Sequence, residues 1–517
     1  MNRLRQTRCR AKDHRPKRRF SATVGFDYPA TRMGPDGPRI ATPETLEAPG
    51  APFRPLPILI AVVAAVAVAL APIPGLAPKA HQVLVILVVA GGLWMSEALP
   101  VAVTALLIPI LGITLAVTDA RGAFAGFGDP IVFLFFGTFL LTDAAAQHGL
   151  TDRLARRVLG SETVRRKPAR LLWAIALLGC GISAWMNNTA TTALLLPLAL
   201  TAERYGSRRL LVGILLMTAY APSLGGLATP VGTAPNLIGL RLLEQVTGQR
   251  PSFTQWCVTF APLAILSTVL TALWLGRGSG EAKATDANAP REAPRPWSRA
   301  ERTLMPLFGV VILLWILPGV LAGTPLQGAP WLKAWQARLP EPAVPVLGAL
   351  ALFLLPSGAR GGARILEIQA LKRVDWSTLL LFGGGLSLGS MMFDSGLARA
   401  LGEGIFRAMP LGGTYGIVLA ATLMAVIVSE MTSNTASASL VVPVVLALAQ
   451  AAGVDPVKPA LAATIACSFG FMLPVSTPPN ALVFATGKLR IREMVACGAL
   501  LDLGGVLLVS AWVTLLG

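Results

Sequence analysis

The stretch W-M-N-N-T-A-T-T-A-L-L-L-P, at Trp185–Pro197, has a counterpart in E-M-T-S-N-T-A-S-A-S-L-V-V-P, at Glu430–Pro443. In both copies a polar Asn-Thr pair interrupts an apolar segment, and Asn188 and Asn434 lie 246 residues apart. A polar motif that recurs in two corresponding apolar segments is typical of a duplicated transport fold. The pattern therefore predicts that each half of the chain supplies one half of a binding site.

The composition places the chain in a membrane. Hydrophobic residues make up 54% of the chain and charged residues only 14%, a balance that excludes an ordinary water-soluble domain of this size. The net charge of +18 comes largely from basic residues near the N-terminus and in loops, which is the pattern of cytoplasmic loops rather than of a nucleic-acid surface. We predict an all-α polytopic membrane protein without a large soluble domain.

Apolar runs divide the chain into two halves, 55–276 and 303–517, which a hydrophilic linker at 277–302 joins. Residues 1–54 are rich in Arg, Lys and Pro and lack an apolar run, which predicts a disordered basic tail or a start site that belongs at Met33. The expected apolar segments are 56–74, 81–97, 100–117, 130–150, a hairpin at 171–202, a broken span from about 209, 256–276, 303–323, 343–356, a span from 376, a hairpin at 414–449, a broken span at 459–487, and 495–517.

Loop charges predict how the two hairpins enter the membrane. Seven basic residues between Arg153 and Arg170, and three more between Arg204 and Arg209, place both ends of the first hairpin on the cytoplasmic side. By the same rule the second hairpin enters from the opposite face. The prediction is about 11 transmembrane helices plus two re-entrant hairpins in an inverted repeat, in the inner (plasma) membrane. The N-terminus is then cytoplasmic and the C-terminus lies on the other side.

Two further pairs of strings keep the same register. D-P-I-V-F-L-F-F-G at Asp129–Gly137 aligns with D-W-S-T-L-L-L-F-G at Asp375–Gly383. P-V-G-T-A-P-N, which ends at Asn236, aligns with P-V-S-T-P-P-N, which ends at Asn480. The interval from the hairpin Asn to the second motif is 48 residues in one half and 46 in the other. Agreement among separate strings argues against chance similarity.

These polar motifs have the chemistry of an ion site. Asn and Thr before a helical run predict a half-helix that starts at membrane depth, where free N–H groups and the helix dipole favour an anion. The proline-rich strings break a span, and the carbonyl groups freed there can bind a small cation. No Arg or Lys lies in any of the four strings, so a bound anion needs co-bound cations. The alternative is that these polar residues only hydrogen-bond neighbouring helices, and that Glu430 only pins a loop.

Together with W-M-S-E-A-L-P at Trp94–Pro100, these motifs resemble the divalent anion/sodium symporter family, the solute carrier 13 or INDY-like di- and tricarboxylate transporters. The resemblance covers roughly 55–517. It implies an elevator-type homodimer in which hairpin tips hold a substrate carboxylate and two sodium ions. By this resemblance, the substrate contacts are Asn188, Thr189, Asn434, Thr435, Thr233, Thr477 and Pro478; sodium site 1 is Ser183, Asn187, Asn188 and Gly232; and sodium site 2 is Ser429, Ser433, Asn434 and Ser476.

One position departs from the family pattern. The first motif has Asn187 where the family usually has Ser, so the identity of the cation at the first site stays open. Asn still offers a carbonyl oxygen to a cation.

The expected function is import of C4-dicarboxylates such as succinate, malate or fumarate by sodium symport. A sodium-independent dicarboxylate exchanger and a citrate or sulfate transporter of the same family are the alternatives. An enzyme is not expected, because no nucleophile, base or metal-ligand cluster is apparent, and no cofactor is expected beyond sodium as the coupling ion. A passive channel would have a continuous polar pore, which this pattern lacks.

Overall fold

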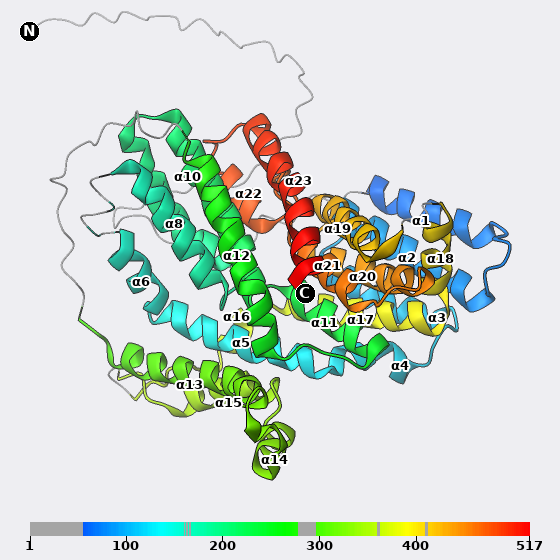
Figure 1. Ribbon diagram of the computed structural model, residues 1–517, viewed down its shortest axis with the longest axis horizontal. Helices are drawn as coiled ribbons and strands as arrows, with labels where there is room; N and C mark the ends of the chain where they lie inside the picture. Colours follow the sequence, from blue (N-terminus) through cyan, green and yellow to red (C-terminus); the bar gives the residue numbers. More distant parts are fainter. Residues whose placement is uncertain are drawn as a thin grey trace, which may run out of the picture. The chain divides into compact units, whose positions relative to one another are not determined.

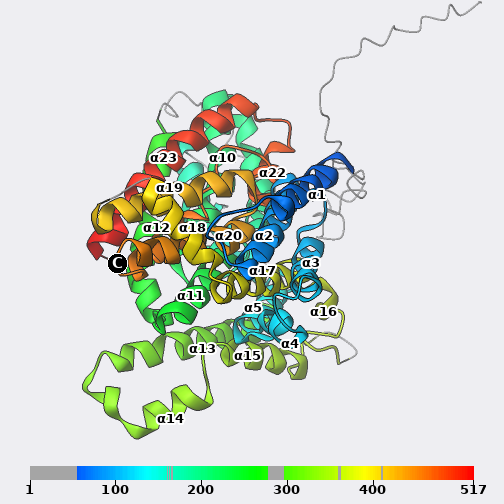
Figure 2. The same ribbon diagram turned by 90° about the vertical axis from the view of Figure 1, so that its right-hand side faces the viewer.

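The protein is described by a computed structural model, and the described residues fold almost entirely into helices (Figures 1 and 2). In this part of the chain nine helices are long and apolar enough to cross a membrane, and one bent pair brings the number to ten. This result confirms the predicted all-α polytopic fold. The predicted tail at 1–54 and most of the predicted linker at 277–302 lie outside the described residues. The structure describes residues 55–159, 161, 164, 167–277, 296–358, 362–408 and 412–516.

The first half follows the predicted order of spans, hairpin, broken span and final span. Its hairpin is α8 and α9, and its broken span is α10 and α11. The helices are α1 (Pro55–Leu70), α2 (Pro78–Ser96), α3 (Val101–Thr114), α4 (Ala120–Phe124), α5 (Pro130–Gln147), α6 (Leu150–Leu159), α8 (Pro168–Ser183), α9 (Asn188–Leu200), α10 (Arg208–Gly225), α11 (Ala234–Thr247) and α12 (Phe253–Leu275).

The second half has the corresponding hairpin in α19 and α20 and the corresponding break between α21 and α22. Its helices are α13 (Arg299–Ala322), α14 (Pro330–Arg338), α15 (Ala343–Leu354), α16 (Ala370–Arg373), α17 (Trp376–Asp394), α18 (Leu397–Ala408), α19 (Gly413–Met431), α20 (Asn434–Ala451), α21 (Val457–Ala466), α22 (Pro478–Phe484) and α23 (Ile491–Leu516).

Matching helices start for the same chemical reason. Asp129 caps α5, because its carboxylate accepts from the N–H of Ile131 at 3.0 Å. Asp375 caps α17 and accepts from the N–H of Thr378, also at 3.0 Å. A side-chain acceptor at this position satisfies a donor that the helix itself cannot. The alignment of the two Asp-initiated strings is therefore also an alignment of helix starts.

The two halves pack in corresponding ways. The first helix of each hairpin lies along the first part of its own broken span, α8 on α10 and α19 on α21. The second part of each broken span packs across the duplication, α11 against α20 and α22 against α9. This crossed packing brings the hairpins and the breaks of both halves into one region.

Burial separates an inner set of helices from an outer one. Within the span Arg208–Ala228, 94% of its apolar 18-residue stretch is buried, so α10 lies inside the protein. In α1, by contrast, Leu56, Leu59 and Ile60 are exposed, and in α13 Met305 and Leu313 are exposed. Apolar faces of this extent are expected to contact lipid. The predicted binding motifs belong to the inner set.

Two amphipathic helices, one in each half, are additional to the predicted segments, as are the shorter helices α4, α14 and α16. α6 follows α5, and α18 follows α17, so they occupy corresponding places in the two halves. α6 contacts α9, and α18 packs closely on α20. Both are amphipathic and carry arginines, so a search for apolar runs misses them. Apolar residues at a 3.6-residue period are the signal that would have revealed them.

Candidate functional site

The tip of the first hairpin is organised by a serine and two asparagines. Ser183, at the end of α8, donates a hydrogen bond from Oγ to Asn188 Oδ1 at 2.6 Å. Asn187 precedes α9, and its Oδ1 accepts from the backbone N–H of Thr189 at 2.7 Å and of Ala190 at 3.4 Å. Asn187 therefore holds the helix start, while Ser183 and Asn188 place two oxygen atoms side by side.

The second tip repeats this arrangement. Ser429 Oγ donates to Asn434 Oδ1 at 3.0 Å and lies 2.7 Å from the carbonyl oxygen of Cys467. Ser433 precedes α20, and its Oγ accepts from the N–H of Ala436 at 3.3 Å. The serine and asparagine that form the pair are five residues apart in both halves. The duplication thus extends to individual hydrogen bonds.

The helix caps lie one residue before the predicted positions. We predicted that the Asn-Thr pairs precede the two helices, but Asn188 and Asn434 are the first helical residues, and Asn187 and Ser433 are the caps. The physical reason is that a cap needs extended backbone and a short acceptor that reaches the next N–H groups, and the earlier residue has both. The predicted feature, a helix N-terminus at each polar tip, is present.

This geometry explains the departure at Asn187. Its side-chain oxygen serves the helix start, which is also what Ser433 does at the second tip. We expect Asn187→Ser to keep uptake and the apparent sodium affinity, because serine is an equally good cap, whereas Asn187→Ala should cost about 1 kcal/mol of stability. Thermal unfolding of both variants with and without sodium checks this. A large loss of sodium affinity in Asn187→Ser would instead make the Asn187 carbonyl a direct ligand.

Each break in the spans is held by the asparagine that ends the second motif. Asn236 donates from Nδ2 to the carbonyl oxygens of Gly226 at 2.9 Å and Thr229 at 2.8 Å. Asn480 does the same with Gly470 at 2.9 Å and Leu473 at 3.0 Å. Both side chains are fully buried. These bonds replace helix hydrogen bonds that the break removes, which is how irregular backbone persists among buried helices.

Two glycines that sequence reasoning did not single out lie close to oxygen atoms of the tips. A Cβ added to Gly226 would lie 3.0 Å from Asn188 Oδ1 and 3.1 Å from the carbonyl oxygen of Gly232. A Cβ on Gly470 would lie 3.1 Å from the carbonyl oxygen and 3.2 Å from the hydroxyl of Ser429. The absence of a side chain thus lets several oxygen atoms approach each glycine closely, and oxygen is the hard ligand type that sodium requires. A motif search looks for functional side chains and ignores residues that have none, so it did not indicate these two glycines.

Glu430 closes the second break. Its carboxylate accepts from the N–H of Met472 at 2.8 Å, the N–H of Leu473 at 3.2 Å and the hydroxyl of Ser476 at 2.7 Å. The side chain is buried, with 4% of its surface exposed. The interpretation that Glu430 pins a loop is therefore correct. In the first half the corresponding residue is Ala184, so this anchor belongs to the second half alone.

The structure gathers the predicted residues around the two tips. Ser183, Asn188 and Gly232 meet at the first, and Ser429, Asn434 and Ser476 meet at the second. The tip residues are partly exposed, whereas the other predicted serines and the threonines that precede α11 and α22 are buried, and Pro478 is exposed at the first position of α22. Their roles in binding stay predictions. The partly exposed tip residues are Asn187, Asn188, Thr189, Ser433, Asn434 and Thr435, and the buried threonines that precede α11 and α22 are Thr233 and Thr477.

A basic side chain near the breaks is already neutralised. Arg241, on α11, lies 2.6 Å from Asp129 and 3.3 Å from Glu244. An arginine engaged with two carboxylates is a poor partner for a substrate anion. The four polar strings themselves contain no basic residue, so amides, hydroxyls and helix N-termini are the groups that they offer to an anion.

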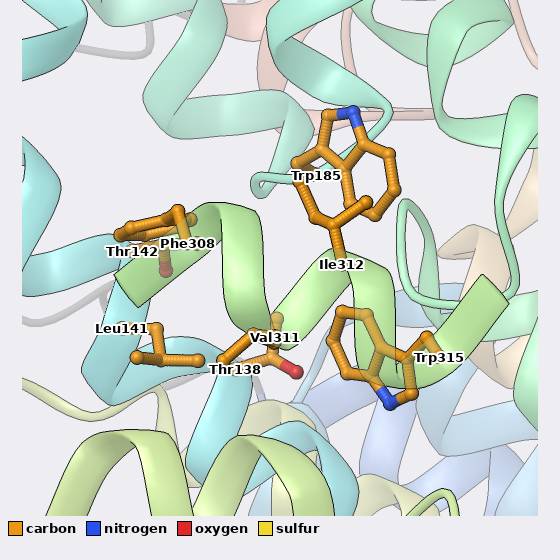
Figure 3. A pocket seen from close by; sticks show the side chains of 8 residues that line it. All are labelled: Thr138, Leu141, Thr142, Trp185, Phe308, Val311, Ile312 and Trp315. Atoms are coloured by element: carbon orange, nitrogen blue, oxygen red, sulfur yellow. The ribbon is translucent and has the colours of Figure 1, made fainter. Parts of the chain in front are cut away.

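A separate cavity lies between the first tip and α13, as Figure 3 shows, with Trp185 on one side and Thr138 of α5 on another. Its volume is about 10 Å³, which is room for one water molecule at most and excludes a dicarboxylate. Trp185 stacks on Trp315 at 6.4 Å between ring centroids, and Trp315 stacks on Phe253 at 4.9 Å. Through Trp185, this aromatic stack packs the tip of the first hairpin against α12 and α13.

Known proteins resemble this chain over most of its length. A family model described as a citrate transporter (CitMHS) matches residues 92–457 and 331–516. An uncharacterized transporter of Haemophilus influenzae is 33% identical, over 84% of this chain and 91% of that protein. The sodium-dependent dicarboxylate transporter SdcS of Staphylococcus saprophyticus is 28% identical, over 80% and 82%. The sodium-dependent high-affinity dicarboxylate transporter 3 of Caenorhabditis elegans is 29% identical, over 79% and 78%.

A solved structure supports the fold. The YdaH transporter of Alcanivorax borkumensis, described as having an unusual topology, superposes with a TM-score of 0.55 and covers 84% of this chain and 99% of that chain. The two sequences are 18% identical, so this likeness concerns the fold alone.

Proposed function

Because this chain belongs to the divalent anion/sodium symporter family of membrane transporters, we propose that it imports C4-dicarboxylates such as succinate, malate or fumarate together with sodium ions. The observation that carries this proposal is the paired arrangement of Ser183 with Asn188 and of Ser429 with Asn434. Each pair sits at a helix N-terminus beside a broken span. Two equivalent half-sites suit a ligand with two equivalent charged ends.

In this mechanism each tip binds one carboxylate. The Oδ1 atoms of Asn188 and Asn434 are engaged with serines, so the amide nitrogens remain as donors to an anion. Among the described residues, the hydroxyls of Thr189 and Thr435 have no hydrogen-bond partner and add two further donors. Sodium ions beside Gly232 and Ser476 would lower the electrostatic cost of bringing the dianion into a site without basic side chains. Substrate and sodium binding are then thermodynamically coupled.

Two functions of the same family are the rivals. A sodium-independent dicarboxylate exchanger would use the same tips without the cation. Citrate is favoured by the description of the matching family model, and sulfate is a smaller divalent anion. The two half-sites favour a linear dicarboxylate, because citrate would have to place a third carboxylate away from both helix N-termini.

We also propose how the protein works in its membrane. Both hairpins are re-entrant, and the helices that carry them move as an elevator against the outer helices of a homodimer. The protein lies in the plasma membrane with its N-terminus cytoplasmic and its C-terminus outside. Accessibility of single cysteines at the two tips, measured from each side of the membrane, tests the re-entrant topology. The mass of the purified protein in detergent tests the dimer.

The test of function is uptake by proteoliposomes that contain only the purified full-length protein. We expect saturable accumulation of labelled succinate under an inward sodium gradient, and a large decrease when choline replaces sodium. Uptake in choline that requires internal succinate would instead establish exchange. No uptake of succinate, malate or fumarate, combined with uptake of citrate or sulfate, would reject the proposed substrate class.

A further inference from the structure

One face of α23 lies against the break of the second half. Gly498, Asp502 and Gly505 share this face, because they are spaced by four and three residues on the helix. A Cβ on Gly498 would overlap the backbone of Phe471, and a Cβ on Gly505 would overlap the ring of Phe469. The two glycines therefore let α23 approach the broken segment closely. Asp502, between them, faces the segment from the same side.

Asp502 is a buried carboxylate without adequate donors. Only 3% of its surface is exposed. It touches the carboxylate of Glu430 and the backbone amide of Phe471. Within the described residues, however, neither of its oxygen atoms has a hydrogen bond of normal geometry. A carboxylate in such a position is costly unless something positive joins it.

The neighbouring side chain, Glu430, cannot donate a hydrogen bond to Asp502 when it is ionised, because a carboxylate only accepts. The oxygen atoms of Glu430 already accept three hydrogen bonds, from Met472, Leu473 and Ser476. Two carboxylates in contact repel each other strongly when both are buried and ionised. The pair therefore needs a positive charge between its members.

Resting on the proposed function, we propose that Asp502 and Glu430 form a third sodium site beside the second hairpin. Both carboxylates supply oxygen ligands. The carbonyl oxygen of Phe471, which accepts from Tyr220 at 3.0 Å, has a second lone pair and lies beside Gly498, one turn before Asp502 on α23. Hard oxygen ligands of this kind suit sodium. Glu430 also accepts a hydrogen bond from Ser476, which belongs to the predicted second sodium site. The sodium ions at the second and third sites would therefore be coupled through the carboxylate of Glu430.

A proton is the chemical competitor. A sodium ion between two carboxylates leaves a net charge of −1, and so does one proton shared between them. The first half offers no equivalent, because Ala184 stands where the second half has Glu430. The site would thus add a single cation to a transporter whose other cation sites come in pairs.

The experiment compares wild type with Asp502→Asn, which keeps the shape and removes the charge. Labelled sodium and succinate uptake are measured in parallel in proteoliposomes, and sodium-dependent thermal stabilisation is measured on the purified protein without substrate. We expect Asp502→Asn to lower the uptake ratio by about one sodium per succinate, and to raise the sodium concentration for half-maximal stabilisation about tenfold or more. Asp455→Asn, an exposed position before α21, is the matched control and should equal wild type.

Two results would overturn the site. One is an unchanged sodium ratio together with unchanged sodium stabilisation. The other is a pH dependence of uptake that disappears in Asp502→Asn while the sodium ratio stays the same, which would assign a proton to the pair. If Asp502→Asn does not fold, Asp502→Ser is measured in its place. Sodium stabilisation needs no transport, so a failure of the proposed substrate remains distinguishable from a failure of this site.

Discussion

Replacing Asn188 and Asn434 by alanine is expected to abolish sodium-driven dicarboxylate uptake. Each substitution removes the oxygen that pairs with a serine and the amide that would donate to a carboxylate. Hydrogen bonds to charged groups contribute about 1.5–3 kcal/mol each, so each single variant should lose roughly tenfold or more in substrate affinity. Uptake by proteoliposomes and substrate-dependent thermal stabilisation are the measurements.

Comparison of the two single variants tests whether the half-sites act together. If each tip binds one carboxylate of the same molecule, either substitution alone should impair binding, and the double variant should lose more affinity than either single variant. Gln245→Ala is the amide-to-alanine control, since that side chain is exposed and contacts only Ser390 Oγ among the partners described. Normal uptake by Asn434→Ala would contradict a bipartite site.

Adding one methyl group at Gly226 is expected to impair sodium binding without unfolding the protein. The new Cβ would lie 3.0 Å from Asn188 Oδ1 and 3.1 Å from the carbonyl oxygen of Gly232, closer than normal packing allows. Overpacking of this kind costs about 1–3 kcal/mol. If the tip oxygens shift to relieve it, the sodium affinity should fall about 5- to 150-fold. The sodium concentration for half-maximal uptake is the measurement, and Gly470→Ala should act likewise.

Neighbouring glycines provide matched controls for this prediction. A Cβ on Gly225 would overlap the backbone of Cys180, so Gly225→Ala should reduce the amount of folded protein. Gly181, in α8, has nothing within 4 Å of the added atom, so Gly181→Ala should keep both fold and sodium affinity. Sodium affinity that is equal in Gly226→Ala and Gly181→Ala would remove Gly226 from the site.

Much of the fold was predictable because membrane spans are long apolar runs. The expected hairpin at 414–449 is close to α19 and α20, which cover Gly413–Ala451. The amphipathic helices α6 and α18 were not predicted, since their arginines interrupt the apolar signal. The caps were misplaced by one residue, because the side chains of Asn187 and Asn188 are equally able to cap and only the backbone chooses between them.

The sequence by itself determined the duplication, the all-helical membrane fold and the polar composition of both tips, because repeats, apolar periodicity and residue type are properties of the linear order. Only the tertiary structure decided which oxygen atoms meet. Gly226 approaches Asn188, and Asp502 touches Glu430, through helices that are distant in the chain. Such contacts depend on how the helices of each half pack against one another, and a glycine or a lone aspartate carries no local signal of its partner.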